Sequence, residues 1–161
     1  MLRFQLNPLT LRKIRRFQSI RRGWWSLVVF ALMVAAALAA ELWINDRALV
    51  VRYQGEWHFP TYGAPLPGTT FGLDYAYETD YRDLKRRFAA GGDDNWVLMP
   101  LVPYGPYTTD LHDDAFPPFA PDWRQRHFLG TDTVGRDVLA RLVYGFRIAI
   151  FFSLEIGRAH V

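Results

Sequence analysis

An apolar run near the N-terminus constrains this chain more than any other feature. Residues 24–40 contain no charged side chain, and the run continues to Ile44 with Glu41 as its single interruption. As a helix, it would extend about 30 Å at about 1.5 Å per residue, which matches the hydrocarbon core of a bilayer. Tryptophans, whose amphipathic rings favour the membrane interface, flank both ends of the run: Trp24, Trp25 and Trp43. The pattern predicts a transmembrane helix over 23–45.

Charge is distributed unevenly around this run. Residues 1–22 carry seven basic side chains and no acidic one, whereas the rest of the chain carries twelve basic and sixteen acidic ones. By the positive-inside rule, 1–22 is predicted to be a basic cytoplasmic arm. The alternative is a cleaved signal peptide, because Ala37-Leu38-Ala39 fits a small-x-small cleavage site. The long basic arm and the flanking tryptophans favour an uncleaved helix.

Residues 46–133 have the composition of a loop-rich insert outside the membrane, which we expect on the periplasmic side. Nine of the ten prolines lie between Pro60 and Pro121. The segments 48–53 and 56–59, joined by Gln54-Gly55, predict a β-hairpin.

Two further elements are predicted in this insert. Residues 81–89 predict a short helix with Leu84 and Phe88 on one face. Residues 96–102 predict an extended segment, which Pro100 would confine to the edge of a sheet. The acidic, proline-rich segment 108–122 is predicted to be a mobile loop.

Polar turn residues lead directly into a second apolar pattern. Gly130, Thr131 and Asp132 are typical turn and N-cap residues. Apolar side chains then recur at spacings of three and four: Val134, Val138, Leu139, Leu142, Val143 and Phe146. We expect an amphipathic interfacial helix over 134–146 and the start of a second transmembrane helix over 147–154. The pattern alone is equally typical of a surface helix in a soluble domain.

Residues 155–161 do not continue the second apolar run. Glu155, Arg158 and His160 would place polar groups where lipid is expected, at about 2.5 to 3.5 kcal/mol for an Arg at the centre of a span. The heptapeptide also resembles the translation of a common sequencing-library adapter. We therefore expect 155–161 to be non-native and the natural protein to continue past Leu154. The alternative is a genuine short C-terminal tail.

The order of residues around the turn resembles that of a known family. His127-Phe128-Leu129-Gly130-Thr131-Asp132, then Gly135-Arg136-Asp137-Val138-Leu139 and Tyr144-Gly145-x-Arg147, is similar to the segment before the second span of C-type permease subunits in oligopeptide and dipeptide ABC importers. Residues 41–47 and 51–60 are similar to the Yej-type branch of that family, which includes a peptide and microcin C importer. The resemblance covers roughly residues 10–154.

This resemblance implies the N-terminal part of an inner-membrane permease subunit, multi-pass at full length, that forms part of a peptide translocation pathway. The implied partners are a second permease subunit, a cytoplasmic ATPase subunit, a periplasmic peptide-binding protein and the lipid bilayer. A separate subunit hydrolyses ATP, so no enzymatic activity is expected here. The motif residues are expected to position the chain rather than to catalyse: His127, Leu129, Gly130, Thr131, Asp132, Gly135, Arg136, Asp137 and Arg147.

Other classes of function are disfavoured by what the sequence contains and lacks. The absence of cysteine excludes disulfides and thiolate metal sites, and no hydrolase, zincin or Walker motif occurs. Asp110, His112, Asp113 and Asp114 are the best metal-ligand candidates, but their spacing matches no known set. We expect no cofactor, no metal and, because the insert is acidic, no nucleic-acid partner. The remaining alternative is a membrane-anchored periplasmic binding or envelope-structural module.

Together the patterns predict a mainly α membrane protein. It would contain one N-terminal transmembrane helix, a loop-rich periplasmic insert with a small β-hairpin, an amphipathic helix and the start of a second transmembrane helix.

The charge distribution generates a topology prediction. Residues 1–22 should be cytoplasmic and 46–133 periplasmic. Because the chain has no native cysteine, a cysteine at Gly92 should react with a membrane-impermeant thiol reagent in spheroplasts. A cysteine at Arg12, the matched control, should react only after the inner membrane is breached. The reverse order of labelling would contradict this topology.

Overall fold

The computed structural model describes residues 8–91, 94–111 and 115–159, which form helices α1 to α5, three short strands and two 3₁₀ turns. The chain divides into two compact units, one ending at Ala36 and the other beginning at Ala37.

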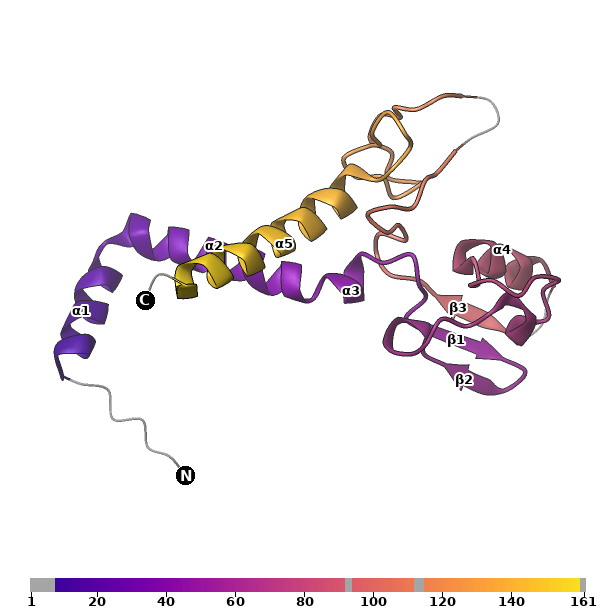
Figure 1. Ribbon diagram of the computed structural model, residues 1–161, viewed down its shortest axis with the longest axis horizontal. Coiled ribbons are helices and arrows are strands. Elements are labelled where there is room, and N and C mark those ends of the chain that lie inside the picture. Colours follow the sequence, from indigo (N-terminus) through magenta and orange to yellow (C-terminus); the bar gives the residue numbers. More distant parts are fainter. Residues whose placement is uncertain (1–7, 92–93, 112–114, 160–161) are drawn as a thin grey trace. The chain divides into compact units, whose positions relative to one another are not determined.

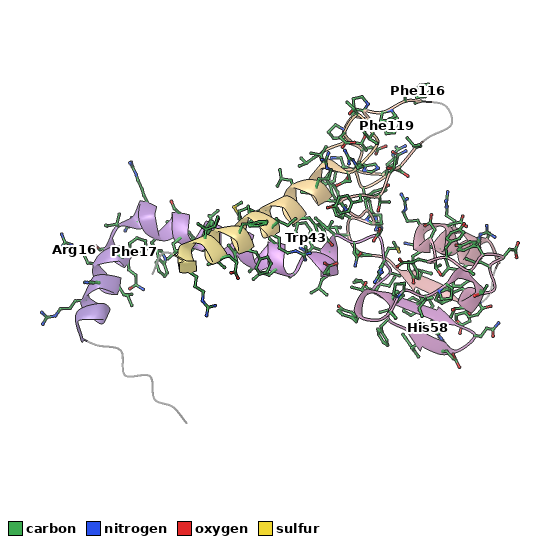
Figure 2. All side chains as sticks on the ribbon, viewed as in Figure 1. Arg16, Phe17, Trp43, His58, Phe116 and Phe119 are labelled. Carbon is green, nitrogen blue, oxygen red and sulfur yellow. The ribbon has the colours of Figure 1, made fainter. Side chains whose placement is uncertain are left out.

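The first unit consists of two helices. The basic arm contains α1 (Pro8–Ser19), which the sequence analysis did not anticipate, and α2 (Arg21–Leu38) follows it. Figure 2 shows Arg16 and Phe17 on α1. Large apolar side chains of α2 are exposed, among them Trp25 at 64% and Leu32 at 65%. Among the residues that the structure describes, α2 is the one helix that is long and apolar enough to cross a membrane.

The predicted single helix over 23–45 is interrupted. The helix α2 ends at Leu38, and a short helix, α3 (Ala40–Trp43), follows after Ala39. The predicted helix also stops short of residue 45, because the backbone after α3 leaves the helix to pair with a distant segment. The N–H of Asn45 donates to the carbonyl of Val102 at 3.1 Å, and the N–H of Val102 donates to the carbonyl of Trp43 at 2.8 Å.

A three-stranded antiparallel sheet forms the centre of the insert. The strands β1 (Val50–Tyr53) and β2 (Glu56–His58) form the predicted hairpin, with Arg52 opposite Trp57. Its turn has positive φ at Gln54 (49°) and Gly55 (85°), the geometry of a type I′ hairpin turn, which favours glycine. The strand β3 (Trp96–Leu98) pairs with β1 at the other side. The sheet order β2-β1-β3 confirms the predicted edge position of this segment, although the strand ends at Leu98.

Helix α4 (Tyr81–Gly91) packs beside β3 (Figure 1). The predicted helix at 81–89 is therefore confirmed, and Leu84 and Phe88 both face the core. The Asp80 carboxylate caps its start by accepting hydrogen bonds from the N–H groups of Arg82 (2.9 Å) and Asp83 (3.2 Å). The core of the insert brings the sheet, a 3₁₀ turn (Gly68–Phe71) and α4 together: Ala48, Val51, Phe71, Tyr81, Leu84, Val97 and Met99.

The last helix, α5 (Val138–Ala159), begins later than expected and runs through 147–154 into 155–159 without a break. The expected start at 134 is wrong. The Asp132 carboxylate instead accepts the N–H groups of Val134 and Arg136 in a turn, and Gly135 has φ 83°. Val134 is 51% exposed and lies before the helix.

The start of α5 packs against the end of α2 and α3 through small side chains. Ala37, Ala40 and Ala140 are completely or almost completely buried. Their cluster also contains Ile44, Val102, Tyr104 and Val143, and the partly buried Trp43 (Figure 2) packs against it. Small residues allow two helical segments to approach closely, as is common between membrane helices. Leu142, which lies on the predicted apolar stripe, is 57% exposed.

The packing of α4 generates a stability prediction. Replacing the fully buried Leu84 with Ala should lower the free energy of unfolding by about 2 to 5 kcal/mol, because it leaves a cavity in the core of the insert. Leu101→Ala is the matched control, since Leu101 is 58% exposed and should change stability by about 0.5 kcal/mol or less. Denaturant unfolding of the full chain in detergent, followed by near-ultraviolet circular dichroism of the Trp57–Trp96 pair, measures both. An equal loss of unfolding free energy in the Leu84→Ala and Leu101→Ala variants would contradict the described core.

Candidate functional site

The motif segment 127–137 forms a compact turn just before α5. Two of its glycines have left-handed backbones, with φ 73° at Gly130 and 83° at Gly135. A Cβ at Gly130 would lie 2.5 Å from the carbonyl oxygen of Phe119, and one at Gly135 would lie 2.6 Å from that of Asp110. Both conformation and space therefore require glycine at these two positions. The turn therefore packs closely against the preceding segment at Phe119 and Asp110.

Thr131 makes part of that attachment. Its N–H donates to the carbonyl of Phe119 at 3.0 Å, and its hydroxyl accepts the N–H of Phe119 at 2.8 Å. The N–H of Asp110 donates to the carbonyl of Gly135 at 2.9 Å. The segment 108–122, predicted to be a mobile loop, thus makes specific contacts with the motif at two places.

His127 is the buried centre of the site. Its side chain is 0% exposed, its Nδ1 lies 2.8 Å from Oδ2 of Asp137, and its Nε2 lies 3.2 Å from Oδ2 of Asp110. The ring stacks on Tyr104 with centroids 3.9 Å apart. A histidine between two carboxylates donates from both nitrogens when it is protonated.

Asp137 uses both carboxylate oxygens. While Oδ2 binds His127, Oδ1 accepts the N–H of Ala140 at 2.7 Å. Asp137 is therefore the N-cap of α5, and the expectation that Asp132 would cap the helix is wrong. Asp137 is completely buried. The cap also places negative charge at the positive end of the helix dipole.

The cluster continues from His127 into the insert. Oδ1 of Asp110 lies 2.9 Å from Nη1 of Arg82 on α4, and this guanidinium lies 4.8 Å from the centre of the Tyr104 ring. The Tyr104 hydroxyl donates to the carbonyl of Gln125 at 2.9 Å. Arg82, Asp110, His127 and Asp137 thus form a chain of alternating charge from α4 to α5. We call it the junction cluster.

Electrostatics favour the charged form of His127. Burial alone would lower its pKa, but the hydrogen bonds that the ring donates to Asp110 and Asp137 outweigh it and raise the pKa from 6.5 to about 9. The hydrogen bond to His127 and the nearby Arg82 lower the pKa of Asp110 to about 2, against the opposing effect of burial. The junction cluster therefore contains two positive and two negative groups, and its net charge is zero at neutral pH.

Asp132 organises a second, more exposed group of contacts. Hydrogen bonds from the backbone N–H groups of Arg136 and Val134, with further contacts from the Arg136 guanidinium, lower the pKa of Asp132 to about 2. Nη2 of Arg136 lies 2.9 Å from Oδ2 of Asp132, and Arg141 on α5 also binds that carboxylate. Arg136 and Arg141 thereby attach the turn to the helix.

Two predicted motif residues lie apart from the junction cluster. Leu129 is 49% exposed. Arg147 lies farther along α5, where its Nη1 is 3.0 Å from Oε1 of Glu41. The Tyr144 hydroxyl donates to Oε2 of the same carboxylate at 2.9 Å, and the Arg147 guanidinium lies over the Tyr144 ring. Glu41 was the single acidic residue in the first apolar run, and this arrangement neutralises it.

The residues that complete these contacts were not predicted from the sequence. Asp110 was expected only as a metal-ligand candidate, although its carboxylate pairs with Arg82 and His127. The other metal candidates, residues 112–114, lie outside the described residues, and within the described ranges no group of three metal-ligating side chains could hold an ion. An acidic residue in one apolar run and an arginine in the other were the available signal for the Glu41–Arg147 pair.

Comparison with known proteins identifies relatives over most of the chain. It is 38% identical over 152 residues to the inner membrane ABC transporter permease protein YejE of Escherichia coli K12, an alignment that covers 93% of this chain and 43% of the relative. It is 30% identical over 174 aligned residues to the peptidoglycan transport system permease protein YejE of Agrobacterium fabrum, covering 93% and 44%. No family model and no solved structure matches the chain.

A shorter match is found to the dipeptide transport system permease protein DppC of Escherichia coli K12, at 42% identity over 60 residues, 35% of this chain and 18% of the relative. The chain thus belongs to the ABC transporter permease family and is a membrane protein. Within that family it is YejE-like, because the match to YejE proteins extends over 93% of its length. It spans less than half the length of those curated relatives.

The junction cluster generates a pH prediction. A pKa raised from 6.5 to about 9 at His127 means that the stabilisation is complete below about pH 6.5 and is lost as the pH rises through 9. The free energy of unfolding should therefore fall by about 3 kcal/mol across this range, at about 1.36 kcal/mol per pKa unit.

Denaturant unfolding of the full chain in detergent, measured from pH 6 to pH 10, checks this result. His127→Gln should remove the slope, whereas His58→Gln, the control on β2, should retain it. A wild-type stability that stays level or rises over this interval would contradict the geometry of the junction cluster.

Proposed function

We propose that this chain is the N-terminal part of an inner-membrane permease subunit of a bacterial peptide ABC importer. The observation that carries the proposal is the 38% identity to a permease over 93% of the chain. The proposed partners are a second permease subunit, a cytoplasmic ATPase subunit and a periplasmic peptide-binding protein. The permease itself performs no chemistry, because ATP hydrolysis belongs to the ATPase subunit.

In this proposal α2 is the first transmembrane helix, with 1–22 in the cytoplasm and 46–133 in the periplasm. The exposed apolar surface of α2 supports this assignment, because such a surface is stable in contact with lipid. The outer part of α5 is similar, with Phe152 and Leu154 each 65% exposed, and would begin the second transmembrane helix.

The contact between Glu41 and Arg147 suits two neighbouring membrane segments. A charged group in a bilayer is costly unless it has a partner, and here each segment supplies one member of the pair. The pair would hold the segments in one register, and the small residues Ala37, Ala40 and Ala140 would let them approach.

The motif residues have a positioning role in this proposal. The junction cluster connects α4 of the insert to the first turn of α5, so these charge pairs would hold the periplasmic insert against the start of the second membrane segment. The alternative, a membrane-anchored binding or envelope-structural module, is not favoured, because the similarity to permeases includes both apolar segments and the insert.

A chimera tests the proposed function. In an Escherichia coli strain lacking both YejE and DppC, this chain should replace the aligned part of YejE and restore uptake of a labelled peptide. Membrane fractionation with immunodetection establishes that the chimera is inserted. An inserted chimera that restores no uptake would contradict the proposal.

Variants of the intramembrane pair refine that experiment. Glu41→Leu should reduce uptake, because Arg147 would remain in the bilayer without its partner. The double variant Glu41→Leu/Arg147→Leu should recover part of the activity, since a well-packed apolar pair avoids the unpaired charge. A double variant no better than the single one would show that the two residues act separately.

A further inference from the structure

A cavity of about 650 Å³ opens beside the junction cluster, between α4 and the segments 99–111 and 124–126. Its volume falls within the range of about 300 to 1,000 Å³ that is typical of small-ligand sites. Five basic side chains line it: Arg82, Lys85, Arg86, Arg124 and Arg126. Two acidic residues, Asp80 and Asp110, are also in the lining.

Both acidic side chains are already engaged. Asp110 binds Arg82 and His127, and Asp80 accepts two backbone N–H groups as the cap of α4. Even counted in full, the two carboxylates offset only two of the five basic side chains in the lining. The lining carries an excess of positive charge.

Two of the five cations, Lys85 and Arg124, are available to a ligand, whereas the other three already have partners in the protein. Arg126 donates to the carbonyl of Pro100 at 3.1 Å, and Arg86 lies 3.5 Å from Asp83. Lys85 and Arg124 are exposed, and across the described parts of the chain neither forms an ion pair. They reach the cavity from different elements, α4 and the 124–126 segment.

The convergence of like charges favours an anionic ligand. Cations gathered in a concave site repel one another, and a bound anion would relieve that repulsion. Tyr104, Met99 and Leu111 add apolar wall to the same cavity, so an organic anion fits this lining better than an inorganic ion. Carboxylates form short, strong hydrogen bonds with Lys and Arg.

We propose that this cavity binds peptides through their carboxylate groups, with Lys85 and Arg124 as the ligand-contacting residues. This inference rests on the proposed function, because that function brings peptides to the insert. It gives the importer a preference based on charge. Acidic peptides, and those with a free C-terminal carboxylate, would be held at the periplasmic insert before entering the membrane.

Binding to the full chain tests this directly. The chain is placed in nanodiscs of zwitterionic lipid, and calorimetry compares N-acetyl-Glu-Glu with its neutral counterpart, N-acetyl-Gln-Gln-amide. The acidic peptide should bind at least about tenfold more tightly at low salt, and added salt should weaken its binding. Equal affinities, or no binding of the acidic peptide, would overturn the proposal.

Two double variants of equal charge change locate the site. Lys85→Gln/Arg124→Gln should weaken binding of the acidic peptide at least about tenfold. Arg52→Gln/Arg87→Gln is the matched control, because those residues pair with Asp94 and Asp83 and lie outside the cavity lining, and it should bind like the wild type. Equal losses in both double variants would show only a general charge effect and would overturn the site.

The chimera separates this inference from the proposed function. If the chimera imports peptides while the nanodisc chain shows no preference for the acidic peptide, the proposed function stands and the cavity proposal falls. If the chimera imports nothing while the acidic peptide binds through Lys85 and Arg124, the proposed function falls and the cavity is a carboxylate site of another protein class. If a chimera that carries Lys85→Gln/Arg124→Gln loses uptake of acidic peptides but keeps uptake of neutral ones, the result supports both the proposed function and the cavity proposal.

Discussion

The Asp137 carboxylate is the interaction on which the arrangement of the larger unit depends. One oxygen caps α5 and the other binds His127, so the beginning of the helix and the buried histidine share a single anchor. A capped start defines where the helix begins. Because His127 also binds Asp110, and Asp110 binds Arg82, the same anchor extends to α4. The helix and the insert are therefore joined by charge rather than by apolar packing alone.

Two of the polar groupings of this unit balance opposite charges. The junction cluster balances two positive groups with two negative ones, and Glu41 balances Arg147 in the proposed membrane region. Buried pairs contribute little net stability, but removing one member is expensive because it leaves an unpaired charge. Such pairs define a specific geometry more than they add stability. That property suits a protein in which a domain outside the membrane must hold a fixed relation to a membrane segment.

The cavity next to Arg82 differs from these balanced groups. Its lining has more positive charge than its carboxylates can neutralise. The neighbouring junction cluster has no net negative charge that could balance this excess. An anion at Lys85 and Arg124 would lie beside the charge chain that leads to α5.

Local sequence patterns determined much of the architecture. The uncharged run predicted α2, the Gln54-Gly55 turn predicted the hairpin, and the spacing of Leu84 and Phe88 predicted α4. These elements follow from periodicity and turn chemistry, which act over a few neighbouring residues. The motif at 127–147 was also sufficient to indicate the family.

Only the tertiary structure decided how the motif residues work. The partners of His127 lie at Asp110 and Asp137, on either side of it in the sequence, and Arg147 meets Glu41 from the other apolar run. The start of α5 at Val138 was likewise missed, because the turn around Asp132 and the cap from Asp137 define it rather than the spacing of apolar residues. Sequence determined which segments could be helix, strand or turn. Long-range pairing of charges and backbone groups decided where those elements end and which residues form the site.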